Sequence, residues 1–490
     1  MLKLEKWRER LKSLAVGILL MTLICLCIIY ILSFSGAENF EFSKEDMEAV
    51  SNESIRYQYL DYWDPSLVSP SFIGFSDKSA GNNIGFYTLG GEHAQIYRSV
   101  YPFLEKLFGK ESSVTPMDSG AGEKLFLSLL KGNYIYLSYA CDLPTSLLLS
   151  MSGDIPTFES NTGEYIRELL IVPKEYLANK TIADPSGNLK QITVYSFYAV
   201  AKDGDGHYYR YDTDFLPTKP DDIAFHTNFY STYTEIENHL IYEFAHLLKQ
   251  DDFLQKNNFS KKVTDTTVIP LEGASYLSSL VFAESRAVSV SDTNPFLEFF
   301  YINPEKVSSY TDDHGILYYF DEGKTITLNQ NGLLRYTSPE TDGISLEMLF
   351  DWSTGEEEYD VFDYFGASFL VSRELQKTYP QANCKLYISG VYYDGTELTI
   401  CFGYAAAGFP LYFDGDADMI RLTFSGDTLK EASYRFRTVH TTAYVTELSD
   451  FLWTLRSYLT QTDTRHRYIY GYYFSKEQNR VGAEILKVTE

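Results

Sequence analysis

A long uncharged segment near the N-terminus places the strongest constraint on this chain. Residues 13–34 read SLAVGILLMTLICLCIIYILSF and contain no charged side chain. About 20 apolar residues suffice to span a bilayer as a helix. The preceding residues 1–12 carry five basic and two acidic side chains, and a basic flank stays in the cytoplasm. We therefore predict a cytoplasmic tail at 1–12, a single transmembrane helix at 13–34 in the cell membrane, and an extracytoplasmic body.

A cleaved signal peptide is the alternative interpretation of this segment. Ser33-Phe34-Ser35 would be a weak small-x-small cleavage site before Gly36. The apolar stretch, however, is longer than the roughly 7–15 residues of an ordinary signal-peptide core. An uncleaved anchor is the interpretation we adopt.

The charge of the body excludes one large class of function. After Gly36 the chain has 36 basic residues (41 − 5) and 65 acidic residues (67 − 2), a net charge of −29. Nucleic-acid binders need a basic surface to neutralise phosphates, so we expect no nucleic-acid partner. Apolar residues make up 44% of the chain, enough to build folded cores.

The first part of the body, 37–225, reads as an α+β domain. Helical patterns cover 92–109 and 122–132, and strand patterns cover 133–140, 168–173, 192–201 and 207–214. A turn, Asp203-Gly204-Asp205-Gly206, joins the last two strands. The helices and strands do not alternate regularly, which favours α+β over α/β. Pro217 and Pro220 indicate a boundary near residue 225.

The remainder reads as two units of one helix followed by an antiparallel sheet, at 226–345 and 346–490. Helical patterns cover 234–254, 360–379 and 446–459. A meander is predicted at 317–320, 325–328 and 333–336, and later strands at 467–474 and 483–488. Ile326 precedes Gly332 as Ile420 precedes Gly426, an offset of 94 residues (420 − 326). This repeat suggests a duplication, although two hairpins can share such spacing by chance.

Two patterns resemble metal sites. His239, Glu243 and His246 would share one side of a predicted helix, and two His with one Glu is a zinc-ligand set. The order of a zinc peptidase, H-E-x-x-H, is absent, so a polar helix flank is favoured. The runs Asp203-x-Asp205 and Asp414-x-Asp416-x-Asp418 resemble calcium ligands, but the second has Met419 where an EF-hand loop needs glycine. Both runs lie at predicted hairpin tips, so solvated turns are favoured. We expect no catalytic residue, no metal and no cofactor.

The predicted membrane helix could itself bind a partner. Ser13 and Gly17 form a small-x-x-x-small pair, and Thr22 and Cys25 add small or weakly polar groups. Helices associate in lipid through close packing at such residues. An ordinary anchor is the alternative, because these residues are common in membrane helices.

No disulfide is expected between Cys384 and Cys401. A hairpin centred on Asp394-Gly395 would place Ile388 opposite Cys401 and Ala405 opposite Cys384. The two sulfurs would then lie roughly 13 Å apart along the strands, beyond the reach of a disulfide bond.

The layout resembles the YycH family of membrane-anchored regulators, found in low-GC Gram-positive bacteria. The stretches that carry the resemblance lie at 134–151, 298–338 and 401–424. The second is the strongest, because Asn303-Pro304 and Val307 lead into the meander. The related YycI family is shorter, and the extra length here favours YycH.

The resemblance implies a regulator without enzymatic activity. Members control the sensor histidine kinase WalK (YycG), and they associate with the kinase and with a YycI-like sister protein through membrane helices and external domains. A passive binder of a cell-wall or small-molecule ligand, using Tyr-rich sheets as stacking faces, is the alternative. A zinc peptidase using His239, Glu243 and His246 is a further one.

Overall fold

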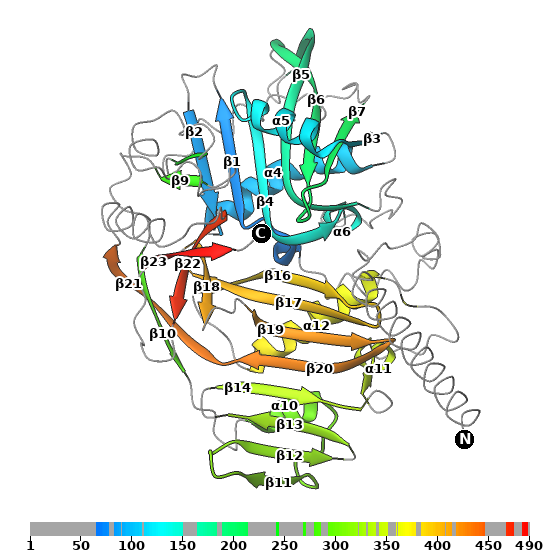
Figure 1. Ribbon diagram of the computed structural model, residues 1–490, viewed down its shortest axis with the longest axis vertical. Coiled ribbons are helices and arrows are strands. Elements are labelled where there is room, and N and C mark those ends of the chain that lie inside the picture. Colours follow the sequence, from blue (N-terminus) through cyan, green and yellow to red (C-terminus); the bar gives the residue numbers. More distant parts are fainter. Residues whose placement is uncertain are drawn as a thin grey trace, which may run out of the picture.

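The computed structural model (Figure 1) describes the chain in segments, all of them between residues 65 and 488. The described ranges are 65–77, 83–89, 91–109, 112–149, 164–183, 189–213, 242–244, 268–270, 279–285, 293–321, 323–329, 332–339, 343–350, 359, 361–378, 384–406, 408–413, 418–445, 467–474 and 483–488. Helices and sheets make up most of these residues, strands dominate, and the strands pair antiparallel except for Phe409–Phe413 with Arg467–Phe474. The predicted α+β class is confirmed.

One antiparallel sheet, which we call the upper sheet after its place in Figure 1, belongs to the N-terminal part of the body. Its strands in spatial order are β2 (Asn83–Thr88), β1 (Phe72–Asp77), β4 (Tyr134–Pro144), β5 (Tyr165–Ala183), β6 (Leu189–Lys202), β7 (Tyr208–Thr213) and β3 (Ser112–Met117). The associated helices are η1 (Pro65–Val68), α4 (Gly91–Phe108), α5 (Ser119–Leu129) and α6 (Thr145–Leu149).

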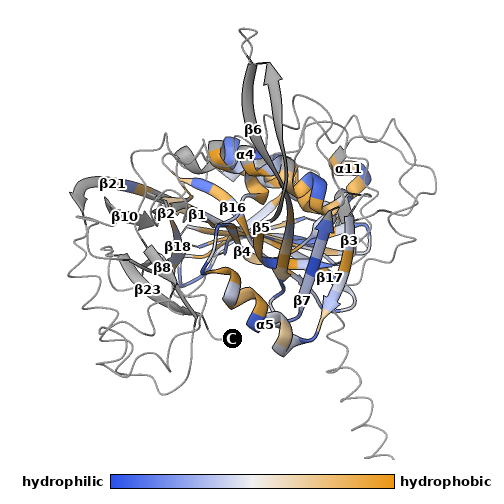
Figure 2. Ribbon diagram, turned by 90° about the horizontal axis from the view of Figure 1, so that it is seen from above, coloured by the Kyte–Doolittle hydropathy of each residue, from blue (hydrophilic) through white to orange (hydrophobic). Residues whose placement is uncertain are grey.

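Helices cover both faces of the upper sheet. Figure 2 shows α4 and α5 on opposite sides of the strands. Phe108 of α4 packs edge-on against Tyr211, whereas Phe126 of α5 packs against Tyr208, which points to the other face. The helix α5 approaches β7 so closely that a Cβ at Gly122 would lie 2.4 Å from the Tyr208 Cβ. This burial on both sides explains why β4 is almost entirely buried.

A second, larger sheet, the lower sheet, holds most of the remaining described strands. Its main path runs β11 (Ser308–Thr311), β12 (Leu317–Asp321), β13 (Lys324–Leu328), β14 (Leu333–Thr337), β20 (Thr428–Arg435), β19 (Asp418–Ser425), β17 (Glu397–Ala406), β18 (Phe409–Phe413), β22 (Arg467–Phe474) and β23 (Ala483–Val488). β15 (Ile344–Ser345) pairs with β20, and β16 (Lys385–Tyr393) pairs with β17. The helices α10 (Asn294–Phe299), α11 (Leu346–Phe350) and α12 (Val361–Thr378) pack on it.

The two halves of the lower sheet share one order of elements. In the first half, α10 precedes the meander β11-β12-β13-β14; in the second, α12 precedes β16-β17-β19-β20, with β18 inserted. Gly332 and Gly426 lie in the last turn of each meander, with φ of 71° and 55°. Positive φ favours glycine at both turns. Two residues that are 94 positions apart in the sequence, Gly332 and Gly426, therefore occupy the same turn in the two meanders.

The two halves form one sheet, because their last strands pair with each other. Leu334 of β14 lies opposite Tyr434 of β20, in antiparallel register. A further pair, β10 (Ser279–Ser285) with β21 (Arg437–Val445), also links the two predicted units. The boundary expected at 345/346 thus falls within a continuous hydrogen-bonded structure.

The upper sheet packs against the β16 end of the lower sheet. Leu89 forms an isolated bridge to Gly408, and Lys385 Nζ donates to Ser69 Oγ at 3.4 Å. Buried Tyr387 of β16 packs with Leu89 and with Ala140 of β4. One continuous hydrophobic core includes side chains of both sheets.

Several predicted elements match the structure, and others need correction. The meander, the helices at 92–109, 122–132 and 360–379, and the strands at 467–474 and 483–488 are confirmed within a few residues. The helix predicted at 234–254 is wrong at Tyr242–Phe244, which form strand β8 paired with β9 (Val268–Pro270). Pairing with a distant strand overrode the helical periodicity there. The tail and anchor at 1–34, the boundary near 225 and the helix at 446–459 lie outside the described residues.

Candidate interaction surface

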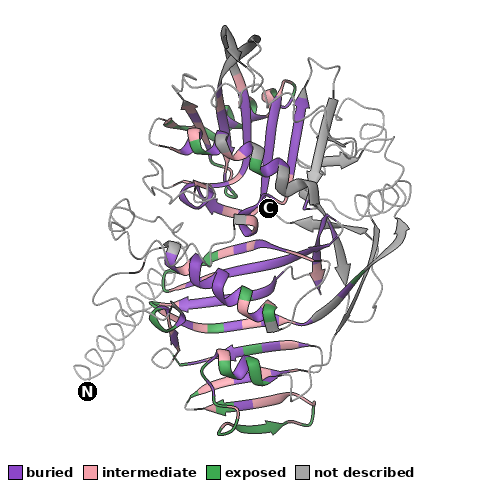
Figure 3. Ribbon diagram, turned by 180° about the vertical axis from the view of Figure 1, so that it is seen from behind, coloured by how far each residue is buried: buried purple, intermediate pink, exposed green. Residues whose placement is uncertain are grey.

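The helices that the structure describes on the lower sheet all lie on one of its two faces. The helices α10, α11 and α12 lie behind the sheet in Figure 1 and in front of it in Figure 3. Ile326 and Tyr336 point to the helix side and are buried, whereas Thr327 and Arg335 alternate with them and point to the other side. We call this other side, along β11–β14, the open face; farther along the sheet the same side is buried at Cys401 of β17. Alternating burial of this kind is usual for a sheet that is covered on one side only.

Three aromatic side chains lie close together on the open face, near the end of the lower sheet. Tyr310 of β11 lies opposite Tyr318 of β12, and their ring centroids are 5.6 Å apart. Phe320, two residues along the same strand, lies 6.0 Å from Tyr318 with the ring planes 2° apart. Tyr310 is 56% exposed and Phe320 is 46% exposed. We call Tyr310, Tyr318 and Phe320 the aromatic ladder.

A neighbouring aspartate holds the ladder in place. Asp312 Oδ1 accepts hydrogen bonds from the backbone N–H groups of His314 and Ile316, at 2.9 and 2.8 Å. Its Oδ2 accepts one from the Tyr318 hydroxyl at 3.3 Å. The hydrogen bond from Ile316, followed by those from His314 and Tyr318, lowers the pKa of Asp312 below its ordinary value. The carboxylate is therefore charged at neutral pH and orients the central ring.

The strand β11 ends the lower sheet. Among the described strands β12 alone pairs with it, and all four of its residues, Ser308–Thr311, are exposed. Figure 3 shows β11 in green at this end, in contrast to the buried β16 at the other. A strand with one unpaired edge presents backbone N–H and C=O groups to any partner that can add a strand.

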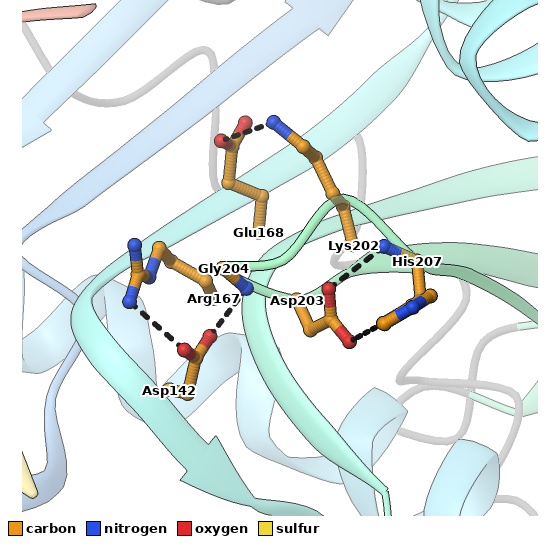
Figure 4. Close-up of polar contacts among 7 residues, drawn as sticks. All are labelled: Asp142, Arg167, Glu168, Lys202, Asp203, Gly204 and His207. Atoms are coloured by element: carbon orange, nitrogen blue, oxygen red, sulfur yellow. Dashed lines mark hydrogen bonds and ion pairs between the residues drawn. The ribbon is translucent and has the colours of Figure 1, made fainter. Parts of the chain in front are cut away.

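A polar cluster lies on the upper sheet, at the turn between β6 and β7 (Figure 4). Arg167 Nη2 donates to Asp142 Oδ2 at 2.8 Å, and the Gly204 N–H donates to Asp142 Oδ1 at 2.7 Å. Burial raises the pKa of Asp142, and Arg167 partly opposes that rise. Asp203 accepts from the backbone N–H and the ring Nδ1 of His207, both at 2.8 Å. The hydrogen bond that the His207 ring donates to Asp203 raises the pKa of His207.

Beside this cluster lies a buried carboxylate. Glu168 is 1% exposed, accepts from the Tyr136 hydroxyl at 2.9 Å, and lies 3.7 Å from Lys202 Nζ. These partners offset the cost of burying its charge. The carboxylates of Asp142, Asp203 and Glu168 thus each accept a hydrogen bond from a neighbouring residue of the upper sheet. The bonds from Arg167 and Gly204 to Asp142 hold the β6–β7 turn against β4 and β5.

The thiols are poor nucleophiles. Burial raises the pKa of Cys384 to about 12 and raises those of Cys141 and Cys401 further. The thiolate is the reactive form, so these free thiols stay largely unreactive at neutral pH. The predicted hairpin register is also corrected, because Cys401 lies opposite Gly390 rather than Ile388. A bulge between Ile388 and Gly390 shifts the pairing.

The residues expected to resemble metal ligands do not form a metal site where they are described. Glu243 lies in strand β8, so the helical spacing that linked it to His239 and His246 is wrong; those two histidines lie outside the described residues. Asp418 instead accepts hydrogen bonds from Ser389 and Arg421, both at 2.8 Å. Within the described ranges, no three His, Cys, Asp or Glu side chains form a group able to hold a metal.

The predicted partner-binding residues Ser13, Gly17, Thr22 and Cys25 lie outside the described residues. Among the helices that the structure describes, none has the length and apolar character needed to cross a bilayer. The aromatic ladder was missed by sequence reasoning. A weak signal was the aromatic and β-branched pair Tyr310-Thr311, which favours a strand and lies directly upstream of the predicted meander.

Comparison with protein-family models, with curated proteins and with solved structures found no match for this chain.

Proposed function

We propose that this protein is a membrane-anchored extracytoplasmic regulator that controls a two-component sensor histidine kinase of the WalK type through protein contacts. The observation that carries the proposal is the open face of the lower sheet, with its exposed aromatic ladder at one end. Exposed aromatic groups that cluster on a polar surface are typical of protein interaction sites. The kinase and a YycI-like sister protein are the partners that the resemblance to the YycH family suggests.

The order of elements in the lower sheet supports the layout on which this proposal depends. The layout consists of a cytoplasmic tail, one anchor and three external units, the last two being related. Two helix-plus-meander halves in the same order support a duplicated pair. The continuous core between the upper and lower sheets makes the body rigid, as suits a protein that acts through its surface.

The geometry of the ladder favours a protein partner over a cell-wall sugar. A sugar stacks on the flat face of an exposed ring. Here Tyr318, the central ring, is half-buried and flanked by Tyr310 and Phe320 at centroid distances of 5.6 and 6.0 Å. Contacts within the ladder therefore occupy part of the area that a sugar would use.

A crosslinking pull-down from the native membrane tests the proposal. The native full-length protein should capture a sensor histidine kinase. The matched variant has residues 14–32 scrambled, which keeps composition and length but removes the pair Ser13 and Gly17 from its packing context. We expect this variant to capture less kinase.

Two outcomes contradict parts of the proposal. If neither protein captures a sensor histidine kinase, the proposed function is wrong. If both capture it equally, the membrane helix is only a tether and Ser13, Gly17, Thr22 and Cys25 do not bind the partner.

A further inference from the structure

The free edge of the lower sheet differs from its other edge in one informative respect. In the order of elements, β11 in the first half corresponds to β16 in the second. β16 is covered by β4 and η1 of the upper sheet, whereas all of β11 is exposed. The same position in the repeated unit is thus buried by another part of the chain at one end and open at the other.

The backbone of β11 is arranged to accept another strand. The Asp312 N–H donates to the Ile316 carbonyl at 3.0 Å. This bond shows that Asp312 and Ile316 form a hydrogen-bonded pair of the hairpin. Such pairs alternate along an antiparallel pair of strands. The backbone N–H and C=O groups of Tyr310 therefore hydrogen-bond to β12. Those of Ser309 and Thr311 face the unpaired edge.

The aromatic ladder extends to this edge. Tyr310 stacks on Tyr318 through the ring face that points to β12, which leaves its other face toward the unpaired edge. A residue on an added strand would sit next to Tyr310 on the open face, where an aromatic or β-branched side chain would continue the ladder. No lysine, proline or bulge protects β11, and such groups usually block unwanted pairing at an edge.

The charge near β11 indicates the kind of strand it would accept. Residues 305–324 contain five acidic and two basic side chains, a net charge of −3. Asp312 and Asp313 follow one end of β11, whereas at the other end Lys306 precedes the strand and Asp321 lies opposite Lys324 of β13. The negative charge is therefore concentrated at the Asp312 end of β11. A second copy of this acidic chain would be repelled, whereas a strand with a basic end beside Asp312 and Asp313 would be attracted.

We propose that β11 is a docking edge at which a partner protein adds an extended segment with a basic end beside Asp312 and Asp313, and that Tyr310 contacts this segment. The inference rests on the proposed function only in identifying the partner as a protein. Four residues offer few backbone hydrogen bonds, so the affinity is modest and depends on the ladder and on charge. The binding weakens as salt concentration rises.

A labelled peptide tests the docking edge on the full-length protein in detergent. The probe has paired lysines at both ends and alternating threonine and tyrosine between them. Control peptides replace the lysines by glutamates, or place a proline at the centre. Fluorescence anisotropy should show binding of the first peptide alone, and hydrogen exchange should show new protection at the amides of Ser309 and Thr311.

Two variants separate backbone pairing from side-chain contact. Ser309→Pro removes the outward N–H but none of the hydrogen bonds to β12, and proline is tolerated at such edge positions. Ser309→Ala is the matched control, because it keeps the N–H. We expect Ser309→Pro to weaken peptide binding about tenfold, the value of one lost hydrogen bond. Ser309→Ala should leave the affinity within about twofold, and Tyr310→Ala should also weaken binding.

Several results would overturn the proposal. One is equal binding of the lysine and glutamate peptides; another is undiminished binding by Ser309→Pro. Concentration-dependent protection of β11 without peptide would mean that a second copy occupies the edge. Kinase capture without peptide binding would refute the docking edge alone, and peptide binding without kinase capture would refute the proposed kinase function alone.

Discussion

The two ends of the lower sheet show how one structural unit can serve two purposes. At the β16 end, Tyr387 is fully buried against Leu89 and Ala140, and the strand contributes to the core. At the β11 end, Tyr310 is exposed and the strand contributes to the surface. The difference lies in what covers each edge. An edge strand is therefore a core element or an interaction surface according to its neighbours, even where the order of elements is the same.

The largest expected effect comes from truncating the covered tyrosine. Tyr387→Ala leaves a cavity where the two sheets meet and should lower the free energy of unfolding by about 3–5 kcal/mol. Tyr310→Ala removes an exposed ring and should cost about 1 kcal/mol or less. Urea unfolding of the full-length protein measures both. Tyr387→Phe is the control for loss of the hydroxyl alone, and equal losses for Tyr387→Ala and Tyr310→Ala would remove the distinction between the ends.

The buried carboxylate in the sheet that covers β16 provides the next test. Lys202→Met removes the ammonium group that lies 3.7 Å from the buried Glu168 carboxylate, and should destabilise the protein by about 3 kcal/mol. The exposed Lys131→Met should change stability by about 0.5 kcal/mol at most.

Hydrogen exchange locates the effect of this change. It should rise in β16 of the Lys202→Met variant and stay unchanged in β11. A second substitution, Glu168→Gln, should restore part of the lost stability. If Lys202→Met lowers stability no more than Lys131→Met does, the ion pair between Lys202 and Glu168 does not stabilise the upper sheet.

The correspondence of the two halves predicts similar costs at matching turns. Gly332→Ala and Gly426→Ala each place a Cβ on a residue with positive φ, and each should cost about 1 kcal/mol. Thermal unfolding with matched scan rates compares them. A Gly120→Ala substitution, in helix α5 where φ is not positive, should not be destabilising. A loss of stability in only one of these two variants would contradict the structural correspondence of the two turns.

The smallest effect concerns pH at the β6–β7 turn of the upper sheet. The hydrogen bond that the His207 ring donates to Asp203 raises the pKa of His207, so the folded state favours the charged ring. This contribution is fully present below the ordinary histidine pKa of about 6.5 and is lost as pH rises through the higher folded-state pKa. The His207 side chain is 54% exposed, so solvent screening keeps the change in stability small.

NMR titration of the His207 ring tests this assignment. Asp203→Asn should lower the His207 pKa toward its ordinary value, and Asp205→Asn should lower it less, because Asp205 acts only through its distant charge. An unchanged titration in Asp203→Asn would show that this carboxylate does not control the ring.

Local patterns were sufficient to predict most of the described elements. The alternation in 317–336 and the long amphipathic segment at 360–379 predicted β12, β13, β14 and α12, because tight turns and helices depend on neighbouring residues. The pairing of β14 with β20 could not be predicted in this way, since no local signal connects Leu334 with Tyr434. The strand at Tyr242–Phe244 shows the reverse case, in which long-range pairing overrides a helical period.

The candidate surface was harder to predict than the fold. Tyr318 and Phe320 lay in a predicted strand, but the side on which they are exposed depends on where the helices pack. Tyr387 lies between Leu386 and Ile388, and Tyr310 lies among serine and threonine residues, so the local sequence favours burial of Tyr387 but does not identify what covers it. Their opposite burial follows from the upper sheet, which covers one of them and not the other.

The pairing of β14 with β20 also has a consequence for biosynthesis. The pairing of Leu334 with Tyr434 cannot form until Tyr434 has been synthesised, 100 residues later (434 − 334). At synthesis rates of about 5–20 residues per second, this interval lasts roughly 5–20 s. During that time β14 is an unpaired edge next to a finished meander, and nascent chains could pair with one another there. The length of the segment between β14 and β20 therefore determines how long the chain is prone to aggregate. A chaperone that shields β14 until β20 has been synthesised would raise the yield of folded protein.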